Sequence, residues 1–270
     1  SRLGIFLISM NSLLSLPAVP KAGQRVSLPA FAGSADALAI AQLADGQHLL
    51  AVVTASPLEA QRLAAEIGWF APGLRVHLLP DWETLPYDHL SPRQDLISER
   101  LATLFAVTQG QCDVLIVAAP TAVTRLAPPA FLAAHTFFMK QGDRLDLDRL
   151  RAQMTLAGYQ HVTQVVAPGE YSVRGGLVDV FPMGTALPYR IELFDDEIDS
   201  LRSFDPETQR SEHPVDSVRL LPAREFPLDA ASAKRVREIL SERFDFDPRR
   251  CPLYQDLKEG GAPAGIEYYL

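Results

Sequence analysis

The sequence has few of the residues that mark common catalytic or metal-binding sites. Only two of its 270 residues are cysteines, Cys112 and Cys251, and neither has a further Cys or His nearby at metal-ligand spacing. The six histidines are scattered without an HExxH spacing, and the chain has no GxSxG elbow. We therefore expect two reduced thiols in a cytoplasmic protein, with no metal site and no hydrolase triad.

The chain also lacks a positive charge balance and a long apolar run. It has 25 Lys and Arg against 33 Asp and Glu, a formal net charge of −8. Because attraction to the phosphate backbone supplies most non-specific affinity for nucleic acid, this balance argues against a free DNA-binding module. The apolar stretch at 1–16 is interrupted by Asn11 and Ser12 and is shorter than the ~20 residues of a membrane span. We expect residues 1–20 to be a poorly ordered extension and expect no membrane partner.

The first half of the chain has the pattern of an α/β domain. Short β-branched runs at 49–54, 76–79 and 114–119 alternate with helical periodicity at 34–43, and with helices that begin at Ser56-Pro57 and Ser91-Pro92. Strands that alternate with helices indicate crossover connections. We therefore predict a mainly parallel sheet in a domain at 21–136.

The pattern changes after Pro128-Pro129. A helix is expected at 148–157, ended by Gly158, and strands follow within 170–180, 190–193 and 198–204. The run Asp195-Asp196-Glu197 is interpreted as a solvated turn between strands. These features predict a small α+β insert with antiparallel hairpins at 137–222. Residues 223–270, with a helix at 230–244, are expected to be a segment in which the chain returns to the first domain. We expect this segment to be truncated.

The segment before the first helix has only some of the residues of a phosphate-binding loop. Such a loop needs glycines, a lysine for the phosphate charge and a hydroxyl for the metal. Gly33 and Ser34 precede the first helix, but Asp36 stands where the lysine belongs and Ala37 where the hydroxyl belongs. An ordinary glycine turn before a helix is the alternative interpretation. Either way we expect no bound nucleotide, no other cofactor and no ATPase activity.

Two unusual strings carry the most specific signal. One is LPDWETLPYD at 79–88, followed by DLISERL at 95–101; the other is GEYSVRG at 169–175, followed by YRIELFDDEI at 189–198. Together, and in this order, they resemble the N-terminal region of the bacterial transcription-repair coupling factors, the Mfd family. The resemblance covers nearly the whole chain from Lys21 onward. It implies a degenerate P-loop, helicase-like domain similar to the first domain of UvrB, interrupted by an insert similar to the UvrA-binding second domain of UvrB.

The resemblance also implies a partner and a surface. In that family the insert binds UvrA, and Arg174, Arg190 and Phe194 map onto the contacting surface, with Glu170 and Arg202 as neighbours. Arginine and aromatic residues are also the types enriched at interface hot spots. The alternatives are that the arginines are solvated or paired inside their own domain and that Phe194 belongs to the core. The loop at 82–88 is interpreted as structural.

The function implied is that of an adaptor in transcription-coupled repair. This region would recruit UvrA without ATPase activity of its own, whereas the full-length family members are ATP-dependent DNA translocases. Contacts to RNA polymerase and DNA would come from other regions, and a C-terminal domain would mask the UvrA surface. The competing hypothesis is one half of an ATP-dependent helicase whose remaining motifs lie beyond residue 270.

Overall fold

The computed structural model describes residues 14–17, 20–44, 48–85 and 90–269. Most of the predicted extension at 1–20 therefore lies outside the described residues, as does the end of the loop predicted at 82–88. By its internal contacts the chain divides into two compact units. The first unit combines residues 1–80 and 106–124, and the second combines residues 81–105 and 125–270.

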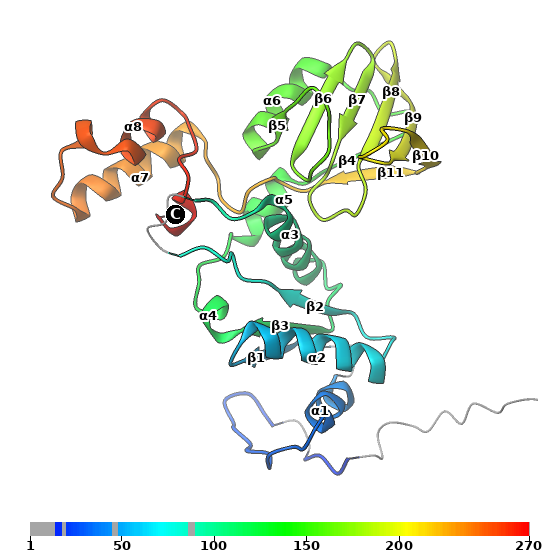
Figure 1. The fold of residues 1–270 in the computed structure, drawn as a ribbon, viewed down its shortest axis with the longest axis vertical. Coiled ribbons are helices and arrows are strands. Elements are labelled where there is room, and N and C mark those ends of the chain that lie inside the picture. The colour runs from blue at the N-terminus through cyan, green and yellow to red at the C-terminus, as the bar shows by residue number, and fades with distance from the viewer. Residues whose placement is uncertain (1–13, 18–19, 45–47, 86–89, 270) are drawn as a thin grey trace, which may run out of the picture. The chain divides into compact units, whose positions relative to one another are not determined.

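The first unit contains a three-stranded parallel sheet (Figure 1). Its strands lie in the order β1-β3-β2, and both pairs are parallel. The elements are α1 (Ala35–Leu43), β1 (Leu50–Thr54), α2 (Pro57–Phe70), β2 (Val76–Leu79), β3 (Val114–Ala118) and α4 (Ala119–Ala122). Ile67 of α2 and Ile116 of β3 lie in one buried cluster with Ala37 of α1. The predicted parallel sheet is confirmed, with strand limits within a residue of those expected.

Local signals set the ends of the helices. Ser56 caps α2 by accepting a hydrogen bond from the backbone N–H of Glu59, and Pro57 is its first residue. In the second unit, α6 (Leu147–Ala157) begins after Asp146, whose carboxylate accepts from two backbone N–H groups, and ends at Gly158 with a left-handed φ of 90°. Both helices had been expected, α2 from Ser56-Pro57 and α6, predicted at 148–157, from its end at Gly158; the cap at Asp146 had not been predicted.

The second unit is built around a six-stranded sheet in the order β10-β9-β8-β7-β6-β5. All neighbours are antiparallel except β5 and β6. The strands are β5 (Gln160–His161), β6 (Glu170–Arg174), β7 (Leu177–Val180), β8 (Tyr189–Phe194), β9 (Glu197–Phe204) and β10 (Ser211–Pro214). The predicted α+β character and its antiparallel hairpins are confirmed. Asp195 and Asp196 form the turn between β8 and β9, as predicted, whereas Glu197 of the same predicted run is the first residue of β9.

Several elements had not been predicted. A second antiparallel pair joins β4 (Phe137–Lys140) to β11 (Ser217–Leu220), and β10 extends the large sheet. The other elements of this part of the chain are α3 (Gln94–Thr108), α5 (Pro129–His135), α7 (Ala230–Arg243), η2 (Pro248–Arg250), α8 (Pro252–Lys258) and η3 (Ile266–Tyr269). Two of these had been predicted: the helix at 230–244 corresponds to α7, and the helix expected to begin at Ser91-Pro92 corresponds to α3, which begins at Gln94. The buried residues Val236 and Leu240 of α7 pack with Leu257 of α8 and Ile266 of η3.

A buried ion pair anchors the loop at 81–85 within the second unit. Arg100 of α3 is fully buried and donates from Nε and Nη2 to the carboxylate of Glu225 at 2.5 and 3.0 Å. The indole N–H of Trp82 donates to the same carboxylate at 3.1 Å, and the Arg100 guanidinium lies 4.9 Å from the indole ring centre. The described part of this loop is therefore packed as expected for a structural segment.

Candidate partner-binding surface

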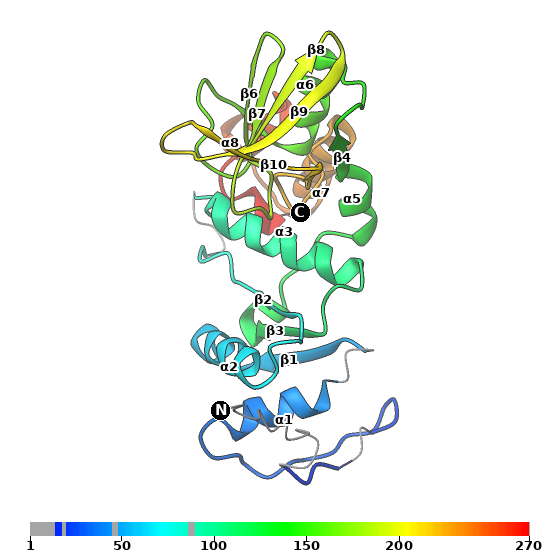
Figure 2. The same cartoon turned by 90° about the vertical axis from the view of Figure 1, so that its right-hand side faces the viewer.

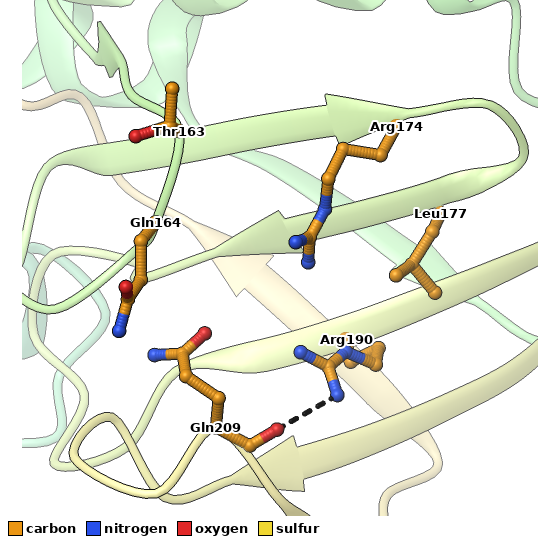
Figure 3. A pocket seen from close by; sticks show the side chains of 6 residues that line it. All are labelled: Thr163, Gln164, Arg174, Leu177, Arg190 and Gln209. Carbon is orange, nitrogen blue, oxygen red and sulfur yellow. Dashed lines mark hydrogen bonds between the residues drawn. The ribbon is translucent and has the colours of Figure 1, made fainter.

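One face of the six-stranded sheet brings together most of the residues that the sequence singled out. The strand register places Ser172, Asp179, Arg190 and Arg202 in one row across β6, β7, β8 and β9. Side chains two residues apart on a strand share a face, so Arg174 lies on the same side as this row. Phe194 has the matching spacing from Arg190 along β8, beyond a shift in the pairing with β9 at Glu192 and Leu193. We call this side of the sheet the arginine face. Figure 3 shows Arg174 on β6 and Arg190 on β8, on either side of β7, with their head groups directed toward each other.

The centre of the arginine face is the carboxylate of Asp179. Its side chain is only 2% exposed. Arg174 donates from Nη2 at 2.7 Å, and Arg190 donates from Nε and Nη2 at 2.8 and 3.0 Å. The sequence analysis had not named Asp179, although an acid within the apolar run LVDVF at 177–181 is an available signal, since acids are rarely fully buried unless paired.

Arg190 is bound by several groups of its own domain. Beyond Asp179, its Nη1 donates to the backbone carbonyl of Gln209 at 3.1 Å and to Oγ of Ser211 at 3.3 Å. Its guanidinium lies 4.8 Å from the ring centre of the buried Phe204. The hydrogen bonds that Arg190 donates to Asp179 raise the pKa of Arg190 above its ordinary value. With 15% of its side chain exposed, Arg190 is mainly a fixed internal cation.

Arg174 is more accessible and borders an open pocket of about 520 Å³. Its side chain is 53% exposed. The pocket is lined by Thr163, Gln164, Arg174, Leu177, Arg190 and Gln209 (Figure 3). Two guanidinium groups and three neutral polar side chains surround it, and among its lining residues none is acidic. Such a lining suits a carboxylate or another small anionic group.

The remaining predicted residues differ in accessibility. Phe194 is 76% exposed at the end of β8, so the alternative that it belongs to the core is wrong. Arg202 is exposed on β9, in register with Arg190. Glu170 is half-buried, and its carboxylate accepts from the backbone N–H groups of Val166 and Ala167 at 2.8 and 2.9 Å. Glu170 thus stabilises the loop that follows Gln164, a residue of the pocket lining.

The phosphate-loop residues lie in the first unit. Gly33 has a left-handed φ of 57°. Ser34 follows it as the N-terminal cap residue of α1, but its side chain makes no capping hydrogen bond. The carboxylate of Asp36 pairs with Arg62 of α2 at 2.6 Å, and this hydrogen bond lowers the pKa of Asp36. The described residues before Gly33 form no strand, whereas a phosphate loop follows one. The structure therefore does not confirm the degenerate P-loop.

Other site types find no support in the described part of the chain. No group of three or more His, Cys, Asp or Glu side chains is placed to hold a metal ion. No helix among the described residues is both long and apolar enough to cross a membrane. Both cysteines are free thiols, and burial raises the pKa of Cys112 above its ordinary value.

Comparison with known proteins first identifies the class of the insert. Residues 137–226 match the UvrB interaction domain family. The match covers β4, the whole six-stranded sheet with its arginine face, and β11. The fold and this match together define a protein that carries a UvrB-type interaction domain.

Longer similarity identifies the family. The chain is 46% identical over 251 residues to the transcription-repair-coupling factor of Escherichia coli, and 44% identical over 238 residues to that of Haemophilus influenzae. These alignments cover 92% and 87% of this chain but 22% and 21% of the relatives. A third relative, from Myxococcus xanthus, is 36% identical over 262 residues. The chain belongs to the transcription-repair-coupling factor family and spans about a fifth of the length of these relatives.

Proposed function

We propose that this chain is the UvrA-recruiting region of a transcription-repair-coupling factor and that UvrA docks on the arginine face. The observation that carries the proposal is the coincidence of two features in one sheet. Residues 137–226 match the UvrB interaction domain, and that same segment exposes Phe194 at the end of β8, the strand that also carries Arg190. Arg174 and Phe194 supply the contacts, and Arg190, Glu170 and Arg202 complete the surface.

The energetics favour a small number of strong contacts. An aromatic side chain that is 76% exposed in the free protein has most of its apolar area left to bury on binding. Phe194 and Arg174 belong to the residue types that dominate interface energetics, and truncating a hot spot costs about 2 kcal/mol or more. The overall negative charge makes a protein partner more suitable than nucleic acid.

The test is a titration of the purified chain with purified UvrA by calorimetry. We expect Phe194→Ala and Arg174→Ala each to weaken binding about thirtyfold, which corresponds to the hot-spot scale. Asp148→Asn is the control, because Asp148 lies on α6 with a side chain that is 93% exposed and is not part of the pocket lining. If both surface variants bind UvrA as tightly as the unchanged chain does, this site assignment is wrong.

Several further features belong to the same proposal. The first unit carries a vestigial phosphate loop at Gly33, Ser34 and Asp36, and the fragment has no ATPase activity. The domain limits are 21–136, 137–222 and 223–270. RNA polymerase and DNA are bound by other regions of a longer cytoplasmic protein, and a C-terminal domain of that protein masks the arginine face until activation.

Electrostatics around Asp36 support the loss of nucleotide binding. Arg62 is shared between Asp36 and Glu66, at 2.6 and 2.7 Å, so two carboxylates face one cation. The resulting local charge is negative and repels a polyphosphate. Calorimetry with ATP and Mg²⁺ at millimolar concentration should show no binding heat; saturable binding would instead favour the helicase-half hypothesis.

A further inference from the structure

The two arginines of the arginine face differ in what they have left to offer a partner. A guanidinium has five N–H donors. Arg190 makes four hydrogen bonds, to Asp179, Gln209 and Ser211, and is 15% exposed. Arg174 makes one among the described residues, to Asp179, and is 53% exposed. The donors that remain on the pocket side therefore belong mainly to Arg174.

Asp179 controls the direction of these donors. It lies on β7, between the strands that carry the two arginines, and its 2% exposure leaves it no contact surface of its own. Its bond to Nη2 fixes one edge of the Arg174 guanidinium, so the remaining N–H groups keep a defined orientation at the pocket. A fixed fork loses less conformational entropy on binding than a free side chain.

Charge balance at the pocket points to an anionic partner group. One buried carboxylate is shared by two guanidinium groups, which leaves one positive charge in excess. Two further charged residues lie in register with this region and offset each other: Glu192, opposite Leu177, accepts from Ser200, and the exposed cation Arg202 is opposite Arg190. A carboxylate from a partner would balance the charge at Arg174 and form charge-assisted hydrogen bonds.

We propose that Asp179 is the positioning residue of the arginine face: it orients Arg174 to bind a carboxylate of UvrA, and Arg190 supports Asp179 without contacting the partner. This inference rests on the proposed function of the same surface. It assigns separate roles to two arginines that the sequence treats as equivalent.

A double-mutant cycle tests the proposal. UvrA binding is measured by calorimetry for the unchanged chain, Asp179→Asn, Arg174→Ala and the double variant, with urea unfolding of each as a measure of folding. We expect Asp179→Asn alone to weaken binding about tenfold, the loss of roughly one charge-assisted hydrogen bond. In the Arg174→Ala background the same change should have little effect, since Asp179 acts through Arg174. A purely structural role would give the same loss in both backgrounds and would overturn the inference.

A second variant keeps the test decisive if Asp179→Asn does not fold. Arg190→Lys preserves a cation beside Asp179 but cannot supply the two parallel N–H bonds. It should weaken UvrA binding in the unchanged chain and not in the Arg174→Ala background. Normal binding by Asp179→Asn and Arg190→Lys, with binding lost in Arg174→Ala, refutes the positioning role alone. Normal binding by Arg174→Ala and Phe194→Ala refutes the arginine face as the docking site and, with it, this inference, whereas no UvrA binding by the unchanged chain refutes the proposed function.

Discussion

The buried pair of Arg100 and Glu225 gives the sharpest stability prediction. Their side chains are 0% and 5% exposed, and Trp82 donates to the same carboxylate. Glu225→Gln keeps an oxygen that can accept from the indole but leaves the Arg100 charge buried without its counterion. Removing one partner of a buried ion pair typically destabilises a protein by about 3 to 5 kcal/mol. We expect the same range for Arg100→Met.

The double variant Arg100→Met with Glu225→Gln separates charge from packing. It removes both buried charges and keeps an acceptor for Trp82. Neutral replacement of a buried pair is often tolerated, so we expect a loss of about 2 kcal/mol or less, mainly from the lost contact between the guanidinium and the indole ring. The two single losses would sum to far more than this. The coupling between the sites should therefore be large.

Tryptophan fluorescence during urea unfolding provides the measurement. The chain has two tryptophans, and Trp69 is 79% exposed in the first unit. In a Trp69→Phe background Trp82 is the only tryptophan, and its signal reports the unit that contains the ion pair. Single variants that lose less than about 1 kcal/mol, or a double variant as unstable as the sum of the singles, would refute the reasoning.

Three further predictions follow from particular residues. Gly158→Ala should destabilise the second unit more than Gly142→Ala does, as measured by thermal unfolding. Both glycines have a left-handed φ, so each substitution should cost about 1 kcal/mol in backbone strain. Only at Gly158 would the new Cβ also clash with Arg224, 2.2 Å from its Nε. Burial raises the pKa of Glu267 above its ordinary value of 4.5, so ionisation of this carboxylate opposes folding. Glu267→Gln should therefore gain stability relative to the unchanged chain at high pH, and this gain should decline as the pH falls through the raised pKa toward 4.5. The ion pair with Arg62 lowers the pKa of Asp36, so Asp36→Asn should cost about 1 kcal/mol or less at pH 7. This cost should shrink as the pH falls below 3.8 and disappear below the lowered pKa, and an unchanged cost at acid pH would contradict this.

Much of the candidate surface could be predicted because its motif is contiguous. The strings around Arg174 and Arg190 identified the family and placed both residues on strands, and the comparisons confirm the family. The alternative of arginines paired within their own domain was also open from sequence, and the structure shows that pairing. Asp179 was missed because its importance depends on the register of three strands, and only the register brings one acid between two arginines.

The sequence by itself determined the elements whose signals are local. A Ser-Pro start defines α2, a terminal glycine ends α6, and β-branched runs define β1 to β3, because caps and side-chain periodicity act within a few residues. Only the tertiary structure decided which distant segments meet. The pairing of β4 with β11 and the bonds from Arg100 to Glu225, 125 positions apart, depend on the whole unit folding, since neither segment carries a local signal that names its partner.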